Sequence, residues 1–187
     1  MRPSVIVLTG PPGAGKSTVA RLVADRFETS VLVPADDFWD YIWRGKIPPW
    51  LPEADDQNRT VIDVLASAAA GYARGGYQVV LEGIVGPWFL DRFLATLRPA
   101  GIGVHYIVLR PTETVTTARA ARRGLDALTD LQPIGHMYRE FSGLGPYESH
   151  VIDSSRLTSE ETAEEVVSAV LDGRMSLLDR QPEDVDP

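Results

Sequence analysis

Short apolar runs alternate along the chain with longer segments in which apolar residues recur at helical spacing. The short runs have the length and composition of buried strands, and they lie at residues 4–9, 31–34, 77–83, 104–110 and 151–153. The helical patterns follow them, at residues 19–27, 55–74, 87–97, 112–123 and 158–171. Because helices alternate with buried strands, the pattern predicts an α/β fold, in which helices cover both faces of a parallel sheet.

A glycine-rich segment joins the first predicted strand to the first predicted helix. Its sequence, GPPGAGKST, fits the phosphate-binding pattern of Gly, four free positions, Gly, Lys and then Ser or Thr. Glycines allow backbone N–H groups to turn toward phosphate oxygens, and the start of the helix adds unpaired N–H groups that favour an anion. We expect Lys16 to reach the β- and γ-phosphates of a nucleoside triphosphate and Ser17 to ligate Mg²⁺; the motif leaves ATP or GTP open. The predicted nucleotide-binding residues are Gly10, Gly13, Ala14, Gly15, Lys16, Ser17 and Thr18. A turn that only connects strand and helix is the alternative, and the flanking elements argue against it.

Carboxylates follow two of the predicted strands. Asp36 and Asp37 come after the second strand, and Glu82 ends the third. Ligands of open α/β sheets bind off the carboxyl ends of the strands, so these side chains are expected near the nucleotide. We interpret Asp36 as a catalytic base, and Asp37 as the N-cap of a helix beginning at Phe38 or as a helper on Mg²⁺. Glu82 is interpreted as an Mg²⁺-associated or water-orienting acid. A purely structural role, as a helix cap for Asp36 and a surface carboxylate for Glu82, stays open.

Aromatic and turn-forming residues dominate the segment from 38 to 54. Its aromatic residues are Phe38, Trp39, Tyr41, Trp43 and Trp50. One interpretation is a lid or wall of an acceptor pocket for an apolar or ring-shaped compound. The other is ordinary core packing, because Trp is often buried for packing alone. Gln57, Asn58 and Arg59, in the first turn of the next helix, could face the acceptor, although a solvated face is favoured.

Three arginines lie on the helix predicted after the fourth strand, at positions 119, 122 and 123. Guanidinium groups bind phosphate oxygens in a bidentate manner, so Arg119 and Arg123 could clamp the transferring phosphate. The alternative is a solvated helix end whose positive charges are favoured by the helix dipole.

Composition adds limits to this prediction. The chain has 187 residues, 44% of them hydrophobic and 24% charged, which is typical of one soluble domain. Its net charge of −8 and its lack of a basic run argue against a nucleic-acid or anionic-membrane surface. It has no cysteine, no stretch long enough to span a membrane and no room for a signal peptide before the first strand. We therefore expect a cytoplasmic protein with one domain over 1–175 and a disordered acidic tail over 176–187. The sequence leaves the oligomeric state open.

With these motifs in place, residues 4–172 resemble the small P-loop kinases, the group of shikimate, gluconate and adenylate kinases and chloramphenicol phosphotransferase. The resemblance implies the three-layer P-loop NTPase fold, with a five-stranded parallel sheet in the order 2-3-1-4-5. It also implies ATP- and Mg²⁺-dependent transfer of the γ-phosphate to a hydroxyl of a small-molecule acceptor, with Asp36 accepting the hydroxyl proton. Arg119, Arg122 and Arg123 fall on the lid of these kinases, here at about 112–145. Residues 151–155 resemble the segment that passes under the adenine ring.

The chain also departs from the group. Polynucleotide kinases have an arginine three residues after the catalytic aspartate, where this chain has Trp39, which argues against a phosphorylated or nucleic-acid acceptor. The aromatic segment has no match in shikimate or gluconate kinase, and it suggests an antibiotic-like or other ring-bearing alcohol. Two alternatives remain: an ATP-binding switch or NTPase without an acceptor, and a nucleotide or polynucleotide kinase.

Overall fold

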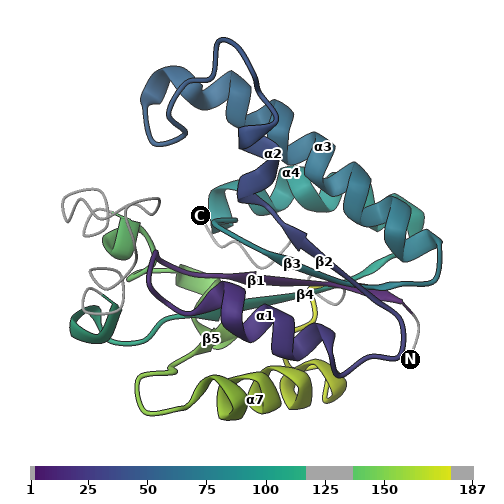
Figure 1. Ribbon diagram of the computed structural model, residues 1–187, viewed down its shortest axis with the longest axis vertical. Helices are drawn as coiled ribbons and strands as arrows, with labels where there is room; N and C mark the ends of the chain where they lie inside the picture. Colours follow the sequence, from purple (N-terminus) through teal and green to yellow (C-terminus); the bar gives the residue numbers. More distant parts are fainter. Residues whose placement is uncertain (1–2, 117–136, 178–187) are drawn as a thin grey trace.

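A computed structural model describes residues 3–116 and 137–177 of the chain (Figure 1). Five parallel strands form one sheet in the order β2-β3-β1-β4-β5, as predicted. The strands are β1 (Ser4–Thr9), β2 (Ser30–Pro34), β3 (Gln78–Glu82), β4 (Gly103–Leu109) and β5 (Val151–Ile152). The predicted strand ranges are therefore correct to within one residue at each end.

Helices cover both faces of this sheet (Figure 1). They are α1 (Lys16–Ala24), α2 (Asp36–Asp40), α3 (Asp55–Arg74), α4 (Pro87–Leu97) and α7 (Ser159–Leu171). Short 3₁₀ helices span Pro52–Ala54, Arg98–Ala100 and Gly145–His150, and residues 113–116 and 137–140 are also helical. Within 3–116 and 137–177, no helix is long and apolar enough to cross a membrane.

Strand β1 divides the hydrophobic core into two parts. Successive side chains of a strand point to opposite faces of the sheet. Val5 and Val7 accordingly pack with the apolar faces of α3 and α4, while Ile6 and Leu8 pack with α1 and α7. Both parts are closed because every apolar side chain of the strand is fully buried. The continuous apolar run in the sequence is the mark of this two-sided burial.

A capping box forms the start of α7. Thr158 Oγ1 accepts a hydrogen bond from Glu161 N at 3.1 Å, and the Glu161 carboxylate accepts one from Thr158 N at 2.8 Å. Two N–H groups at the helix start are thereby satisfied reciprocally. The box sets the first turn of the helix that packs against α1.

The domain extends two residues beyond its predicted end at 175. Tyr106 N donates to Met175 O and Leu177 N donates to Val104 O, each at 2.9 Å, and Ser176 forms an antiparallel bridge with His105. Met175 and Leu177 are buried on either side of Ser176. Ser176 and Leu177 therefore belong to the fold, although their polar and acidic neighbours suggested a tail. Residues 178–187 lie outside the described residues.

Candidate active site

The phosphate-binding loop between β1 and α1 has the backbone that its glycines predict. Gly10, Gly13 and Gly15 have φ angles of 140°, 88° and 93°, in a region that residues with a Cβ rarely adopt. A Cβ on Gly10 would also lie 2.1 Å from the carbonyl oxygen of Leu109. The loop closes through a hydrogen bond of 3.2 Å from Ala14 N to Pro11 O. This turn is the kind that aims backbone N–H groups at an anion.

Lys16 lies inside this loop, with only 7% of its surface exposed. Its ammonium group donates to Gly10 O at 2.9 Å and to Pro11 O at 3.1 Å. Burying an ammonium group costs free energy unless the group is paired or hydrogen-bonded. The two carbonyl contacts meet this requirement and hold the positive charge within the loop. Gly15, the N-cap of α1, has no side chain to cap the first turn, whose N–H groups suit phosphate oxygens. The loop therefore fits the β- and γ-phosphates of a nucleotide.

The candidate carboxylates lie at the same edge of the sheet as the loop. Glu82, the last residue of β3, is in register with Leu8 of β1 on one side and with Pro34 of β2 on the other. The three strands thus end at one level, and Asp36 begins α2 directly beyond β2. Ser17 is half-buried in the first turn of α1, and Thr18 is exposed.

A single glycine sets how closely α2 approaches β3. Ala35 N donates to Glu82 O at 2.8 Å, and Gly83 has a φ of 154°. A Cβ on Gly83 would lie 2.6 Å from the Cβ of Ala35. Because Asp36 follows Ala35, glycine at position 83 allows the start of α2, which carries the candidate base, to lie close to the end of β3. The sequence places this glycine at the end of the third predicted strand and indicates no such role.

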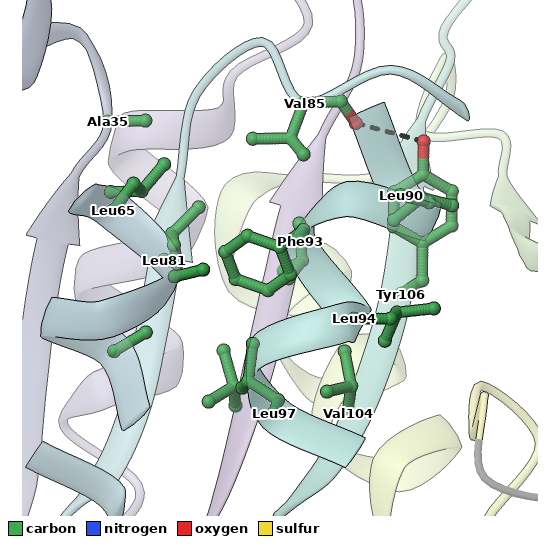
Figure 2. Close-up of a cluster of buried hydrophobic side chains, with 14 of the residues drawn as sticks. Ala35, Leu65, Leu81, Val85, Leu90, Phe93, Leu94, Leu97, Val104 and Tyr106 are labelled. Atoms are coloured by element: carbon green, nitrogen blue, oxygen red, sulfur yellow. Dashed lines mark hydrogen bonds between the residues drawn. The ribbon is translucent and has the colours of Figure 1, made fainter. Parts of the chain in front are cut away.

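Two side chains that sequence reasoning missed hold the turn after β3. Thr9 Oγ1 accepts a hydrogen bond from Val85 N at 3.0 Å. The Tyr106 hydroxyl of β4 donates to Val85 O at 3.0 Å, the bond drawn as a dashed line in Figure 2. Burial raises the pKa of this phenol, so it remains a donor. Both backbone groups of Val85 are satisfied, and the turn is fixed against the end of β1.

The predicted capping role of Asp37 is wrong. Helix α2 begins at Asp36, and Ala35 is its N-cap with helical dihedral angles of −65° and −35°. The hydrogen bond from Phe38 N to Ala35 O already closes the first turn, two residues earlier than expected. Among the described residues no side chain caps this helix. Asp36 and Asp37 are both exposed and, about 100° apart around the helix, point in different directions.

The aromatic segment divides between its two interpretations. Trp39 is a core residue, 7% exposed, whose Nε1 donates to Asn58 Oδ1 at 2.8 Å. Tyr41, Trp43 and Trp50 are 72%, 92% and 54% exposed. Core packing therefore explains one tryptophan of the segment, and it leaves a group of aromatic side chains open to solvent.

Sequence reasoning also placed the start of α3 on a solvated face. Arg59 agrees with this, because it forms an exposed ion pair with Asp55 at 2.9 Å. Gln57 and Asn58 do not, because both bond to the backbone of the aromatic segment. Their spacing from that segment offered no signal in the sequence.

Arg119, Arg122 and Arg123 lie outside the described residues. Another arginine, Arg110, directly follows β4, and the sequence did not predict its role. Its guanidinium binds both carboxylate oxygens of Glu148 at 2.9 and 2.8 Å and donates to Phe141 O at 2.9 Å. The Arg110 hydrogen bonds lower the pKa of Glu148 to about 2, aided by a bond from Leu144 N. This pair holds the 3₁₀ helix that leads into β5.

The segment predicted to pass under the adenine ring is ordered by its own hydrogen bonds. Asp153 Oδ1 accepts from Ser155 N at 2.9 Å and from the Ser155 hydroxyl at 2.5 Å, and these bonds lower the pKa of the carboxyl. The Ser155 hydroxyl oxygen accepts in turn from Thr112 N at 2.8 Å. The segment after β5 is thus tied to the one after β4.

The carboxylates do not form a metal site by themselves. Over residues 3–116 and 137–177, no group of three or more His, Asp or Glu side chains could hold a metal ion. Mg²⁺ characteristically uses one or two protein ligands together with phosphates and water. A hydroxyl at Ser17 with a carboxylate at Glu82 or Asp37 fits that pattern.

Comparison with known proteins gives one family and a consistent fold. The profile of a family described as "AAA domain" matches residues 5–141. The chain is 25% identical over 170 residues to "Threonine synthase-like 1" of Pongo abelii. This match includes 88% of the present chain but only 22% of that relative's length. Two solved structures each have a TM-score of 0.69 at 19% identity. The tunicamycin resistance protein of Deinococcus radiodurans covers 90% of this chain and 96% of its own, and the APS kinase of Mycobacterium tuberculosis 91% and 98%.

Acid should weaken the ion pair between Arg110 and Glu148. The Glu148 pKa is about 2 in the folded chain and near 4.5 without its partners, so the pair stabilises the fold fully above pH 4.5 and progressively less as pH falls toward 2. We expect Glu148→Gln to lower the free energy of unfolding by about 1 kcal/mol or less at pH 7, because the carboxylate is partly exposed. Urea titrations at several pH values measure this difference, with the exposed Glu53→Gln as control. A difference that grew on acidification would contradict the assignment.

Proposed function

The chain belongs to the AAA-domain family of P-loop proteins, and from that premise we propose that it is an ATP- and Mg²⁺-dependent phosphotransferase. The reaction moves the γ-phosphate of ATP to a hydroxyl of a small-molecule acceptor. The buried Lys16 ammonium, held in a left-handed glycine turn at the start of α1, carries this proposal. The likeness to the APS kinase supports the fold that such a reaction requires.

The phosphate loop supplies charge and position. Backbone N–H groups of residues 13–17 and the Lys16 ammonium hold the β- and γ-phosphates, and Lys16 exchanges its bonds to two carbonyl oxygens for phosphate oxygens. Ser17, with Glu82 or Asp37 nearby, would hold Mg²⁺, which would neutralise charge on the transferring group when bound. Phosphoryl transfer depends mainly on such positioning and electrostatic stabilisation.

Asp36 is the proposed base. It lies in the first turn of α2, at the edge where β1, β2 and β3 end, and Gly83 allows that helix close to β3. Its carboxylate accepts the proton of the acceptor hydroxyl as that oxygen attacks the γ-phosphorus, while the bond from the γ-phosphorus to the bridging oxygen breaks and ADP leaves. Arg119 and Arg123 are proposed to meet the charge that develops on the transferring group.

The acceptor is proposed to be a ring-bearing alcohol. Tyr41, Trp43 and Trp50 follow the candidate base within one short segment, and their exposed rings offer stacking surfaces. A compound of this kind agrees with the fold's likeness to a tunicamycin resistance protein. A polynucleotide acceptor is disfavoured, because Trp39 is buried and presents no positive charge to a phosphate.

A screen of ring-bearing and simple alcohols tests the function. We expect slow ATP hydrolysis alone, acceleration by an acceptor that excludes water, and a phosphorylated product detected by mass. Lys16→Ala is the matched control, and it should lose ATP affinity by calorimetry and turnover by orders of magnitude. Hydrolysis that no acceptor stimulates, together with a partner that binds only the ATP form, would favour the nucleotide switch. Unchanged ATP affinity in Lys16→Ala would contradict the assignment of this loop as the phosphate-binding site.

The two adjacent aspartates should differ in their effect on turnover. Asp36→Asn keeps the shape of the side chain and removes the base, so phosphotransfer should fall by about a hundredfold or more while ATP binding survives. Asp37→Asn should retain most activity and at most raise the Mg²⁺ concentration needed for it. Steady-state rates over a range of Mg²⁺ concentrations separate the two roles. If Asp37→Asn lost turnover and Asp36→Asn kept it, Asp37 rather than Asp36 would be the base.

The arginines should act on the rate more than on binding. Replacing Arg119 or Arg123 with alanine should lower kcat more than the affinity for ATP, since these side chains are proposed to meet charge in the transition state. The exposed Arg139→Ala controls for loss of surface charge. If both variants had the kinetics of the parent, the alternative interpretation, that these arginines lie on a solvated helix face, would be favoured.

A further inference from the structure

We propose that Gln57 and Asn58 are positioning residues that hold residues 41–51, here called the aromatic loop, in one conformation against the start of α3. The aromatic loop then forms the acceptor wall before any ligand binds. The inference rests on the proposed function only where it identifies the ligand of the wall as the acceptor. The contacts that fasten the loop can be measured without an acceptor.

Gln57 pairs with the backbone of Ile47 through both ends of its amide. Ile47 N donates to Gln57 Oε1 at 2.8 Å, and Gln57 Nε2 donates to Ile47 O at 2.7 Å. A side-chain amide here makes the two hydrogen bonds that a neighbouring strand would make. One residue in the middle of the loop is therefore fixed in both position and orientation.

Asn58 joins three parts of the structure at a buried position. Its Oδ1 accepts from Trp39 Nε1 of α2 at 2.8 Å, and its Nδ2 donates to Pro49 O of the loop at 2.8 Å. Asn58 and Trp39 are each 7% exposed, so the bond between them is buried, and the bond to Pro49 O is partly buried. Losing one partner would leave a buried polar group unsatisfied, which costs more than the bond itself contributes. The side chain thus couples α2, the aromatic loop and α3.

Two further contacts hold the loop, one to α2 and one within the loop. Lys46 pairs with Asp40 at the end of α2, and Leu51 N donates to Pro48 O at 3.0 Å. The loop stands above α2 in Figure 1, at the start of α3. Its backbone is held by polar bonds on the inner side, while its rings, including Trp43 at 92% exposure, point outward. Core packing would bury these rings, so the arrangement is that of a preformed binding surface.

Preformation has a definite effect on binding. Ordering a loop on binding costs conformational free energy, which lowers affinity for the ligand that the loop contacts. A loop already held by Gln57 and Asn58 avoids that cost. If the two side chains position the wall, their loss should weaken binding of the acceptor and leave binding of ATP unchanged.

Limited proteolysis under native conditions tests the fastening directly. Chymotrypsin cleaves after aromatic residues, and Tyr41, Trp43 and Trp50 offer sites within the loop. Gln57→Met keeps the length and the helix preference of the side chain and removes both hydrogen bonds. Each bond lost should raise the population of the open loop about fivefold, so cleavage should accelerate by about twentyfold or more. Ser67→Ala, which loses an exposed hydrogen bond within the same helix, is the matched control.

A urea titration of each variant separates loop opening from unfolding. We expect the midpoint of Gln57→Met to stay close to that of the control while its cleavage accelerates. Cleavage of the parent as fast as that of Gln57→Met would overturn the proposal. So would acceleration that follows the loss of global stability alone.

Kinetics with an acceptor from the screen test the link to function. Gln57→Met should raise KM for the acceptor by about tenfold or more and leave kcat and KM for ATP within twofold of the parent, since the bonds hold a wall and touch no reacting atom. Equal KM values for the acceptor in the two proteins would overturn the positioning role. If no alcohol is phosphorylated, the proposed function fails, whereas the cleavage rates still decide whether Gln57 and Asn58 fasten the loop.

Discussion

Complete burial of β1 is the constraint on which the rest of the structure depends. A strand with apolar side chains on both faces must be covered on both, so two helices are needed on each side of it. It must also be hydrogen-bonded along both edges, which β3 and β4 do. The phosphate loop follows such a strand directly. Its backbone therefore starts from a strand that is paired on both edges and buried on both faces, and this support holds the unusual conformation of the loop.

The fold could be predicted from the sequence because its strongest signals are local. Buried strands such as β1 and β3 appear as unbroken apolar runs, and the helices between them repeat at 3.6 residues. The phosphate loop could also be predicted from the sequence, because the positive φ angles at positions 13 and 15 favour glycine and the glycines appear in the motif. Where signals were weak, details were missed. The apolar residues 175 and 177 lay in a polar context, and α2 began at Asp36 without any capping side chain.

The candidate site was predicted only where chemistry and motif coincide. Lys16 and Asp36 follow from their places after strands, whereas Thr9, Gly83 and Arg110 act through contacts with residues far along the chain. Thr9 meets Val85, and Arg110 meets Glu148, at sequence separations that no spacing rule covers. Gln57 looked like any polar residue on a helix surface. Such positioning roles depend on tertiary geometry, which a single sequence does not display.

The three residues that pair with the start of β4 also bear on how the protein behaves in solution. Strand β5 has two residues and meets only Val108 and Leu109, so the first half of β4 would otherwise present unpaired N–H and C=O groups. Met175, Ser176 and Leu177 occupy this edge in the antiparallel sense. An exposed strand edge is a template on which another chain can add and aggregate. The segment after α7 thus covers a strand edge through which two copies of the sheet could otherwise associate. A tag or fusion that displaced this segment should lower solubility before it altered the phosphate loop.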